Sequence, residues 1–211
     1  MQIIACISQK GGVGKSVITR LLARELAAAD FVVKIADLDV QQATSTRWIG
    51  TRLENGHKPD ISGAFYKTVG EALRDAGETE IMIFDGKPVA DQQATEVAKK
   101  ADLIVLPSGA SVDDLRPTVQ LMHALLGAGV PAKRMIVVLV SSMTPATEAD
   151  ARAVLENAGI RVAARALRKL PSYEVALGQG QSPSEARGRA DVRKEAADVA
   201  EEIYKALQET E

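Results

Sequence analysis

The sequence predicts an α/β fold of three layers, in which a doubly wound, mostly parallel β-sheet carries helices on both faces. Two observations lead to this prediction. Short apolar runs of four to seven residues, typical of strands buried on both faces, alternate with longer segments whose apolar residues recur at helical spacing. No internal repeat, low-complexity tract or linker interrupts this pattern, so the 211 residues are expected to form a single domain, 1–211.

Composition and charge narrow the classes of function. A hydrophobic content of 46% fills a sizeable core without disulfides, and the single cysteine, Cys6, falls inside the first apolar run, as expected of a buried residue in a reducing compartment. A net charge of −2 argues against a surface that coats nucleic acid, and an aromatic content of 3% disfavours recognition of single strands by base stacking. No secretory leader and no apolar run of membrane-spanning length are visible, so a cytoplasmic protein without a membrane partner is expected.

Each apolar run and each periodic segment predicts one element. The apolar runs predict strands at residues 3–7, 31–39, 80–85, 103–107, 135–140 and 160–164, the last at the edge of the sheet. Helical spacing predicts helices at residues 17–29, 69–76, 113–126, 146–157 and 190–207. Residues 52–60 are predicted to form a polar loop without readable chemistry, and residues 178–183 a second loop.

The segment between the first strand and the first helix has the composition of a phosphate-binding loop. Residues 9–16 read Gln-Lys-Gly-Gly-Val-Gly-Lys-Ser. The glycines allow a tight turn that brings backbone N–H groups close to an anion, and the following helix directs the positive end of its dipole to the same place. The Lys15 ammonium is expected to reach the β- and γ-phosphates of a nucleotide, and the Ser16 hydroxyl to ligate Mg²⁺. The expected nucleotide contacts of this segment are Gly11, Gly12, Val13, Gly14, Lys15, Ser16 and Val17.

Three carboxylates stand at the ends of two further apolar runs. Asp37 and Asp39 end the second predicted strand, and Asp85 ends the third. Ligands of open α/β sheets lie beyond the carboxyl ends of the strands, so these carboxylates are expected at the same edge as the phosphate-binding loop. A strand-tip carboxylate there holds Mg²⁺, usually through water, which is the role predicted for Asp85. The alternatives are that Asp37 and Asp39 are solvated strand ends and that Asp85 caps the next turn.

The loop departs from the general phosphate-loop pattern, because Gln9 stands where glycine is usual and a second lysine follows it. Residues 10–16, Lys-Gly-Gly-Val-Gly-Lys-Ser, resemble the deviant Walker A motif of the ParA/MinD family of dimeric ATPases. This resemblance implies the P-loop NTPase fold, ATP and Mg²⁺ as cofactors, and a homodimer with ATP sandwiched between its subunits. It also implies that Lys10 crosses the interface to contact the nucleotide of the partner subunit.

A second segment supports the same resemblance. Residues 37–41 resemble the family's first switch segment, usually Asp-x-Asp-Pro-Gln, with Val40 in place of proline. The match implies that Asp39 positions the attacking water. The implied catalytic residues are Lys10, Lys15 and Asp39, and the implied magnesium site consists of Ser16, Asp39 and Asp85.

Towards the carboxyl terminus the resemblance bears on the base. Residues 165–176 resemble the family's terminal block, which implies that Pro171 lies against the base of the nucleotide. Relatives place an asparagine that reads adenine after the strand at 135–140, but Ser141 and Ser142 follow that strand here. The sequence therefore supports the binding of phosphate more strongly than it supports adenine as the base of the nucleotide.

The chain most resembles the short ParA-type partition proteins. This implies ATP-dependent dimerisation, non-specific binding of double-stranded DNA with association to the nucleoid in the ATP-bound state, and a ParB-type DNA-binding adaptor that stimulates hydrolysis. A conjugative-transfer accessory ATPase shares every motif and remains an alternative. A MinD-like positioning ATPase is a further alternative, disfavoured because the acidic residues 198–211 would be repelled by anionic lipid. The single Cys6 excludes the iron–sulfur cluster of nitrogenase-reductase-like members, which takes two cysteines per subunit.

Basic residues near the last predicted helix are the candidates for DNA contact. These are Arg187, Arg189, Arg193 and Lys194, with a neighbouring cluster at Arg161, Arg165, Arg168 and Lys169. The alternative is that the arginines are solvated and pair with Glu185, Asp191 and Glu195.

Overall fold

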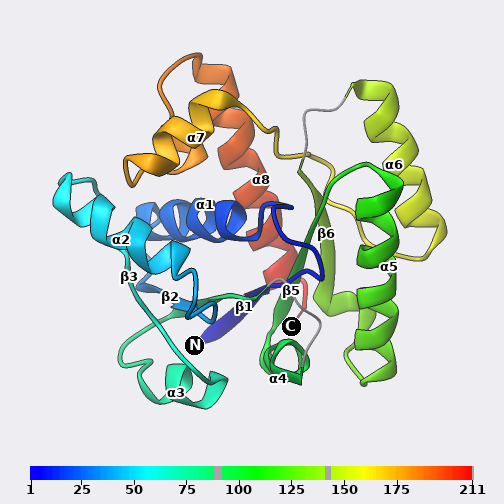
Figure 1. Ribbon diagram of the computed structural model, residues 1–211, viewed down its shortest axis with the longest axis horizontal. Coiled ribbons are helices and arrows are strands. Elements are labelled where there is room, and N and C mark those ends of the chain that lie inside the picture. The colour runs from blue at the N-terminus through cyan, green and yellow to red at the C-terminus, as the bar shows by residue number, and fades with distance from the viewer. Residues whose placement is uncertain (88–91, 141–143, 211) are drawn as a thin grey trace.

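A computed structural model describes residues 1–87, 92–140 and 144–210 of the chain (Figure 1). Within these residues six strands form one sheet in the order β3-β2-β4-β1-β5-β6, and every neighbouring pair is parallel. This confirms the predicted α/β fold. The strands are β1 (Gln2–Cys6), β2 (Val33–Asp37), β3 (Ser62–Phe65), β4 (Ile81–Asp85), β5 (Leu103–Ser108) and β6 (Met135–Leu139).

Helices cover both faces of the sheet, as Figure 1 shows. One face packs against α1 (Lys15–Ala28), α2 (Thr44–Glu54), α7 (Pro171–Gly178) and α8 (Ala190–Gln208). The other face packs against α3 (Val69–Arg74), α4 (Gln92–Lys100), α5 (Val112–Gly127) and α6 (Pro145–Asn157). Two short 3₁₀ turns, η1 (Ala132–Arg134) and η2 (Pro183–Glu185), complete the described elements.

The alternation of side chains along each strand explains the two cores. In β1, Ile4 and Cys6 point to the core beneath α1 and α8, whereas Ile3 and Ala5 point to the core beneath α4 and α5. Successive residues of a strand face opposite sides of a sheet, so a run that is apolar throughout fills both layers. The continuous apolar runs in the sequence are therefore the signature of this sandwich.

Two predictions about the edges of the sheet were wrong. The structure places a strand, β3, at residues 62–65, where none was predicted, because Ser-Gly-Ala-Phe lacks the apolar character of the other strands. Residues 160–164 do not form the predicted edge strand. Their pairing with β6 is limited to an isolated bridge at Val162, and the backbone amides of Ala164 and Arg165 donate to the Glu202 carboxylate of α8 instead.

The predicted polar loop at residues 52–60 was wrong at its start. Arg52 lies in the last turn of α2 and is 2% exposed. Its burial, an unusual state for an arginine, depends on partners far away in the chain that local composition does not reveal.

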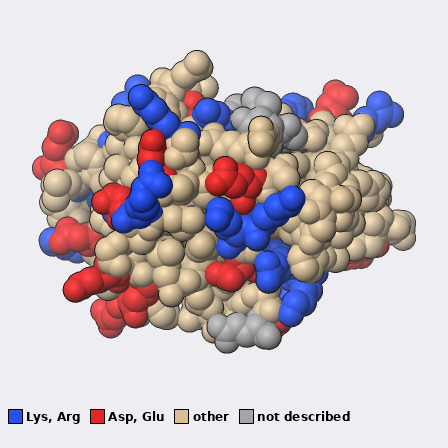
Figure 2. Space-filling view, turned by 90° about the horizontal axis from the view of Figure 1, so that it is seen from below, with Lys and Arg blue, Asp and Glu red and all other residues tan. Residues whose placement is uncertain are grey.

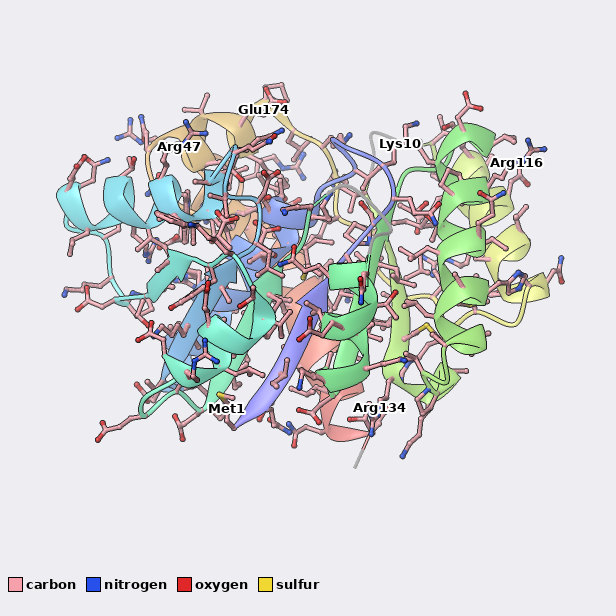
Figure 3. All side chains as sticks on the ribbon, turned by 60° about the horizontal axis from the view of Figure 1, so that its bottom comes forward. Met1, Lys10, Arg47, Arg116, Arg134 and Glu174 are labelled. Atoms are coloured by element: carbon pink, nitrogen blue, oxygen red, sulfur yellow. The ribbon has the colours of Figure 1, made fainter. Side chains whose placement is uncertain are left out.

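Strand register brings the carboxyl ends of the central strands to one level. Asp85 of β4 is the register partner of Cys6 in β1 and of Asp37 in β2. Figure 3 shows Lys10, Arg47 and Glu174 along this edge of the molecule and Met1 and Arg134 at the opposite one. Side chains that follow β1, β2 and β4 therefore meet at a single edge. In the described part of the chain, no helix has the length and apolar character needed to span a membrane.

Candidate functional site

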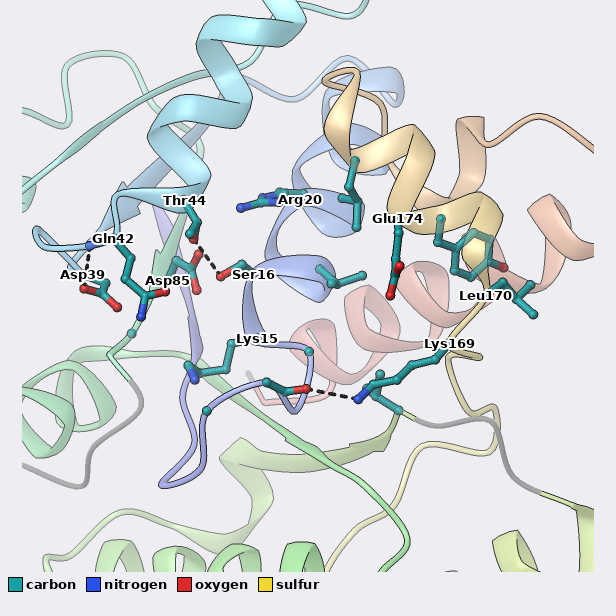
Figure 4. Close-up of a pocket in the computed structure, with 18 of the residues that line it drawn as sticks. Lys15, Ser16, Arg20, Asp39, Gln42, Thr44, Asp85, Lys169, Leu170 and Glu174 are labelled. Carbon is teal, nitrogen blue, oxygen red and sulfur yellow. Dashed lines mark hydrogen bonds between the residues drawn. The ribbon is translucent and has the colours of Figure 1, made fainter.

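A cavity of about 440 Å³ opens at this edge, between the loop after β1, the start of α2, the end of β4 and the helix α7 (Figure 4). Its volume falls in the range of small-molecule sites. Eight of the residues expected from the sequence line it: Gly11, Gly12, Gly14, Lys15, Ser16, Val17, Asp39 and Asp85. Three others, Lys10, Val13 and Pro171, are not among its lining residues.

The loop after β1 owes its path to glycine. Gly12 and Gly14 have φ angles of 73° and 103°, in the left-handed region that other residues rarely adopt. A Cβ atom on Gly14 would also lie 2.9 Å from Val140 Cγ1. Gly14 is the N-cap of α1, so the unpaired N–H groups of the first turn and the positive end of the helix dipole face the cavity. This geometry suits a phosphate group.

Lys15 lies inside the loop, with 7% of its surface exposed. Its Nζ donates to Ser8 Oγ at 3.1 Å and to the Lys10 carbonyl oxygen at 3.4 Å. Burial lowers the pKa of Lys15, and the nearby carboxylates of Asp85 and Asp39 oppose this shift. The Lys15 ammonium is thus held by the loop at the wall of the cavity, where a phosphate bound in the cavity would contact it.

Asp85 is buried at the tip of β4 and lacks a full set of partners. Ser45 Oγ donates to its Oδ2 at 2.6 Å, whereas Oδ1 has no hydrogen-bond partner among the described residues. Burial raises the pKa of Asp85 to about 6, and the hydroxyls of Ser45 and Ser16 offset this only in part. An unpaired buried carboxylate oxygen beside a hydroxyl is the donor set that a hard cation prefers. The residues present therefore fit Mg²⁺.

The two aspartates that end β2 have different surroundings. Asp37 is 1% exposed, and its Oδ2 accepts from the backbone amides of Ser45 and Thr46 at 3.0 and 3.1 Å, so it caps the first turn of α2. Asp39 lines the cavity, and its Oδ1 accepts from the Gln42 amide at 3.1 Å. Asp37 thus shapes the site while Asp39 faces it.

The sequence interpretation gave no role to several residues of the cavity wall near Ser16. Thr44 Oγ1 lies 3.3 Å from Ser16 Oγ, and the Nε of Arg20 donates to Ser45 Oγ at 3.3 Å. The Arg20 guanidinium also lies 5.9 Å from the centre of the Trp48 ring. Arg20 follows Ser16 by one helical turn, and this i, i+4 spacing was the signal in the sequence that placed it beside the site.

The far end of the cavity is apolar. Val140, Leu170, Tyr173 and Leu177 line it, and the Glu174 carboxylate of α7 points into the same space (Figure 4). A planar base fits such a wall better than a charged group does.

Of the family-implied base contacts, Pro171 is the exposed first residue of α7 and stands beside the lining residue Leu170. Ser141 and Ser142 lie outside the described residues. Arg168 and Lys169, grouped with the candidate DNA contacts in the sequence, line the cavity instead, and Lys169 Nζ donates to the Gly12 carbonyl oxygen at 3.1 Å.

Lys10 points away from the cavity and towards α5. Its Nζ lies 2.5 Å from Asp114 Oδ1, and Ser111 Oγ donates to the other carboxylate oxygen at 2.7 Å. Partial burial raises the pKa of Asp114, but the hydrogen bonds from Lys10 and Ser111 outweigh it and hold this pKa below its usual value. Lys10, 44% exposed at its side chain, is therefore located at the rim of the site.

None of the four candidate DNA contacts lines the cavity. Arg187, Arg189 and Arg193 line a separate hollow of about 240 Å³ between the starts of α7 and α8, whereas Lys194 is outside it. Arg189 pairs with Asp191 at 2.5 Å, and Lys194 pairs with Asp198 at 2.7 Å. Part of the positive charge of these candidate contacts is thus neutralised within the chain. Another face of the molecule, seen from below in Figure 2, also carries acidic and basic groups side by side.

The fold and the cavity together define a class, the phosphate-loop nucleotide-binding proteins with a parallel sheet. Residues 4–183 match the family model described as the CobQ/CobB/MinD/ParA nucleotide binding domain, and the chain belongs to this family. This confirms the resemblance seen in the sequence motifs.

Individual relatives agree in length as well as in fold. The chain is 29% identical over 207 residues to the maintenance of carboxysome distribution protein A of Gloeobacter kilaueensis, which covers 96% of this chain and 94% of that protein. The structure of this chain is similar to that of the septum site-determining protein MinD of Pyrococcus horikoshii complexed with Mg-ADP. The TM-score is 0.74 at 16% identity, and the match covers 100% of this chain and 98% of that one. The ATP complex of a Cyanothece McdA variant has a TM-score of 0.71 at 18% identity, with 97% and 96% covered.

Proposed function

We propose that this chain is a Mg²⁺-dependent ATPase of the ParA type, which hydrolyses ATP to ADP and phosphate to control its own dimerisation. The observation that carries the proposal is the convergence of Lys15, Ser16, Asp39 and Asp85 on one cavity from three different strand ends. Family membership and the Mg-ADP and ATP complexes of two structural neighbours support it.

Each of these side chains has a distinct part in the proposed reaction. The first-turn amides of α1 and the Lys15 ammonium hold the phosphates, because a positive helix end and a buried cation favour anions. Ser16 and Asp85 hold Mg²⁺, which neutralises charge that develops on the phosphate oxygens. Asp39 lines the cavity, where its carboxylate orients the attacking water.

Lys10 is proposed to act on the nucleotide of a second copy. Lys10 lies at the edge of the molecule that carries the site, as Figure 3 shows. Its ammonium pairs with Asp114 and does not point into the cavity of its own chain. Two chains that face one another across ATP would bring each Lys10 to the other's phosphates once its ion pair with Asp114 opens.

The proposed cargo rests on the sequence resemblance to partition proteins and on the kind of role that the relatives are named for, and not on the cavity. One relative is named for the distribution of carboxysomes and a structural neighbour for the determination of the septum site, and both names describe the placing of a cellular structure. We propose that ATP-dependent dimers bind double-stranded DNA non-specifically, meet a ParB-type adaptor that stimulates hydrolysis, and segregate plasmid or chromosomal DNA. The alternative, a role as a conjugative-transfer accessory ATPase, would use the same cavity in the same way.

Among the described residues, α8 has its large apolar side chains in the core, which disfavours the MinD-like alternative for this helix. Val199, Ile203 and Leu207 of α8 are fully buried against the sheet and α1. That face is already used in the core, so α8 can present only its polar side to a lipid surface.

Two substitutions test the ATPase proposal. Lys15→Ala should abolish binding of a fluorescent ATP analogue in Mg²⁺, because it removes the cation that compensates the phosphate charge. Asp39→Ala should bind the analogue with parental affinity and release phosphate at least about 100-fold more slowly, because it loses water positioning alone. Equal loss of binding in both variants, or parental hydrolysis by Asp39→Ala, would contradict the proposed division of roles.

A further inference from the structure

Thr44 is the first residue of α2, and it faces Ser16 across the cavity. The two hydroxyl oxygens are 3.3 Å apart, and both side chains line the cavity together with Asp85 (Figure 4). Ser16 belongs to the phosphate-binding loop, whereas Thr44 belongs to the segment after β2. The pair therefore joins two parts of the chain at the place where the metal is expected.

The spacing of these oxygens suits a shared metal ion. Mg²⁺ takes six oxygen ligands at 2.0–2.1 Å in octahedral geometry, which puts neighbouring ligands about 3 Å apart. The Ser16–Thr44 separation is close to this value. Asp85, which is 2% exposed, lines the same cavity, its Oδ1 has no hydrogen-bond partner in the described part of the chain, and its carboxylate supplies the negative charge that such a site needs.

The backbone before Thr44 supports a functional reason for its position. Ala43, the N-cap of α2, has a φ of 43°, a left-handed conformation that is unfavourable for a residue with a Cβ. Its amide donates to the Asp39 carbonyl oxygen at 2.6 Å, and the amides of Ser45 and Thr46 donate to the Asp37 carboxylate. The chain thus maintains an unfavourable conformation that turns the first residue of α2 towards Ser16.

We propose that the Thr44 hydroxyl is a second protein ligand of the nucleotide-bound Mg²⁺, beside the Ser16 hydroxyl. The proposal rests on the proposed function in one respect, that Mg²⁺-nucleotide binds in this cavity. The hydrogen bond between the two hydroxyls is then replaced by two metal–oxygen bonds, and the start of α2 is fixed to the metal.

Fixing Thr44 has a consequence for Trp48, the single tryptophan of the chain. Trp48 lies one helical turn after Thr44 and contacts the Arg20 guanidinium, which in turn bonds Ser45. Metal binding at Thr44 therefore changes the surroundings of one fluorophore, and Trp48 fluorescence should report the metal separately from the nucleotide.

The first experiment measures Mn²⁺ binding to the AMPPNP complex by electron paramagnetic resonance, with Trp48 fluorescence in parallel. Thr44→Val, which keeps the shape of the side chain, should weaken Mn²⁺ affinity at least about tenfold and abolish the metal-dependent fluorescence change. Thr44→Ser should behave as the parent does. The matched control is Thr51→Val, which removes a hydroxyl from the same helix whose partner is the Arg47 carbonyl oxygen.

Affinity for AMPPNP in the presence of EDTA separates the two proposals. It should be the same in the parent and in Thr44→Val, because this threonine contacts the metal and not the phosphates. If the parent itself does not bind Mn²⁺-AMPPNP, both the proposed nucleotide site and the role of Thr44 are overturned. Parental Mn²⁺ affinity in Thr44→Val would overturn the role of Thr44 alone.

A second experiment distinguishes a ligand from a packing contact. Thr44→Cys should lower affinity for Mn²⁺ and raise the preference for Cd²⁺ over Mn²⁺ at least about tenfold, because a thiolate ligand favours the softer ion. The native Cys6 is fully buried and burial raises its pKa to about 12, so it does not compete for the metal. Thr51→Cys is the control. An unchanged Cd²⁺ preference in Thr44→Cys would show that the hydroxyl only packs α2 against α1.

Discussion

Arg52 allows a stringent test of how the end of α2 is held to the rest of the chain. Its guanidinium, 2% exposed, donates to both carboxylate oxygens of Glu185 at 2.8 and 3.0 Å. It also donates to the carbonyl oxygens of Gly180, Lys58 and Pro59 at 3.0, 2.7 and 3.1 Å. One side chain of α2 thus satisfies groups in the loop after the helix and in the segment that follows α7.

Replacement of Arg52 by methionine should be costly, because it leaves the carboxylate of Glu185, 12% exposed at its side chain, without its main partner. Removal of one member of a buried ion pair typically costs about 3–5 kcal/mol. We expect Arg52→Met to lower the free energy of unfolding by this amount. Arg52→Met combined with Glu185→Met should recover part of the loss, because no unpaired charge remains in the double variant.

Urea unfolding followed by circular dichroism and by Trp48 fluorescence measures this change. Trp48 is a local reporter, since its ring lies 5.5 Å from the Arg52 guanidinium and its Nε1 donates to the Gln181 carbonyl oxygen at 3.0 Å. The control is Arg161→Met, which breaks an ion pair with side chains 39% and 61% exposed and should cost less than about 1 kcal/mol. A loss in Arg52→Met no larger than in the control would refute the reasoning.

Two further predictions concern assembly and DNA. Lys10→Ala should leave binding of a fluorescent ATP analogue to the monomer unchanged but weaken the ATP-dependent dimer at least about tenfold, because a charged contact to phosphate is lost across the interface. Light scattering with ATP measures this, and a dimer of parental strength would remove the role in trans. In the parent, affinity for a DNA duplex of arbitrary sequence should depend on ATP and fall steeply with added salt. Arg189→Glu together with Arg193→Glu should abolish this binding and leave dimerisation intact. Lys58→Glu, a single charge reversal at an exposed lysine elsewhere in the chain, is the control; DNA binding that survives the double reversal would mean that these arginines form an ordinary solvated surface.

The sequence by itself determined the layers of the fold and the glycine-rich end of the cavity. Runs such as residues 81–85 are apolar throughout, which a strand can satisfy only when it is buried on both faces, so the sandwich was predictable. The glycines, Lys15 and Ser16 of the loop follow one another directly in the chain, and their spacing alone indicates phosphate binding. That Asp39 and Asp85 line one cavity was predictable, because the ends of the parallel strands β2 and β4 meet at one edge.

The tertiary structure decided which polar groups hold these parts together. Lys10 pairs with Asp114, a residue 104 positions away, and Arg52 pairs with Glu185, 133 positions away. Asp37, which matched the same motif as Asp39, turned out to cap α2. Local periodicity and composition report burial and backbone conformation over a few residues, whereas a buried charge is stabilised by whichever partner packing brings within hydrogen-bond distance. Those partners come from distant segments, and only the folded chain shows them.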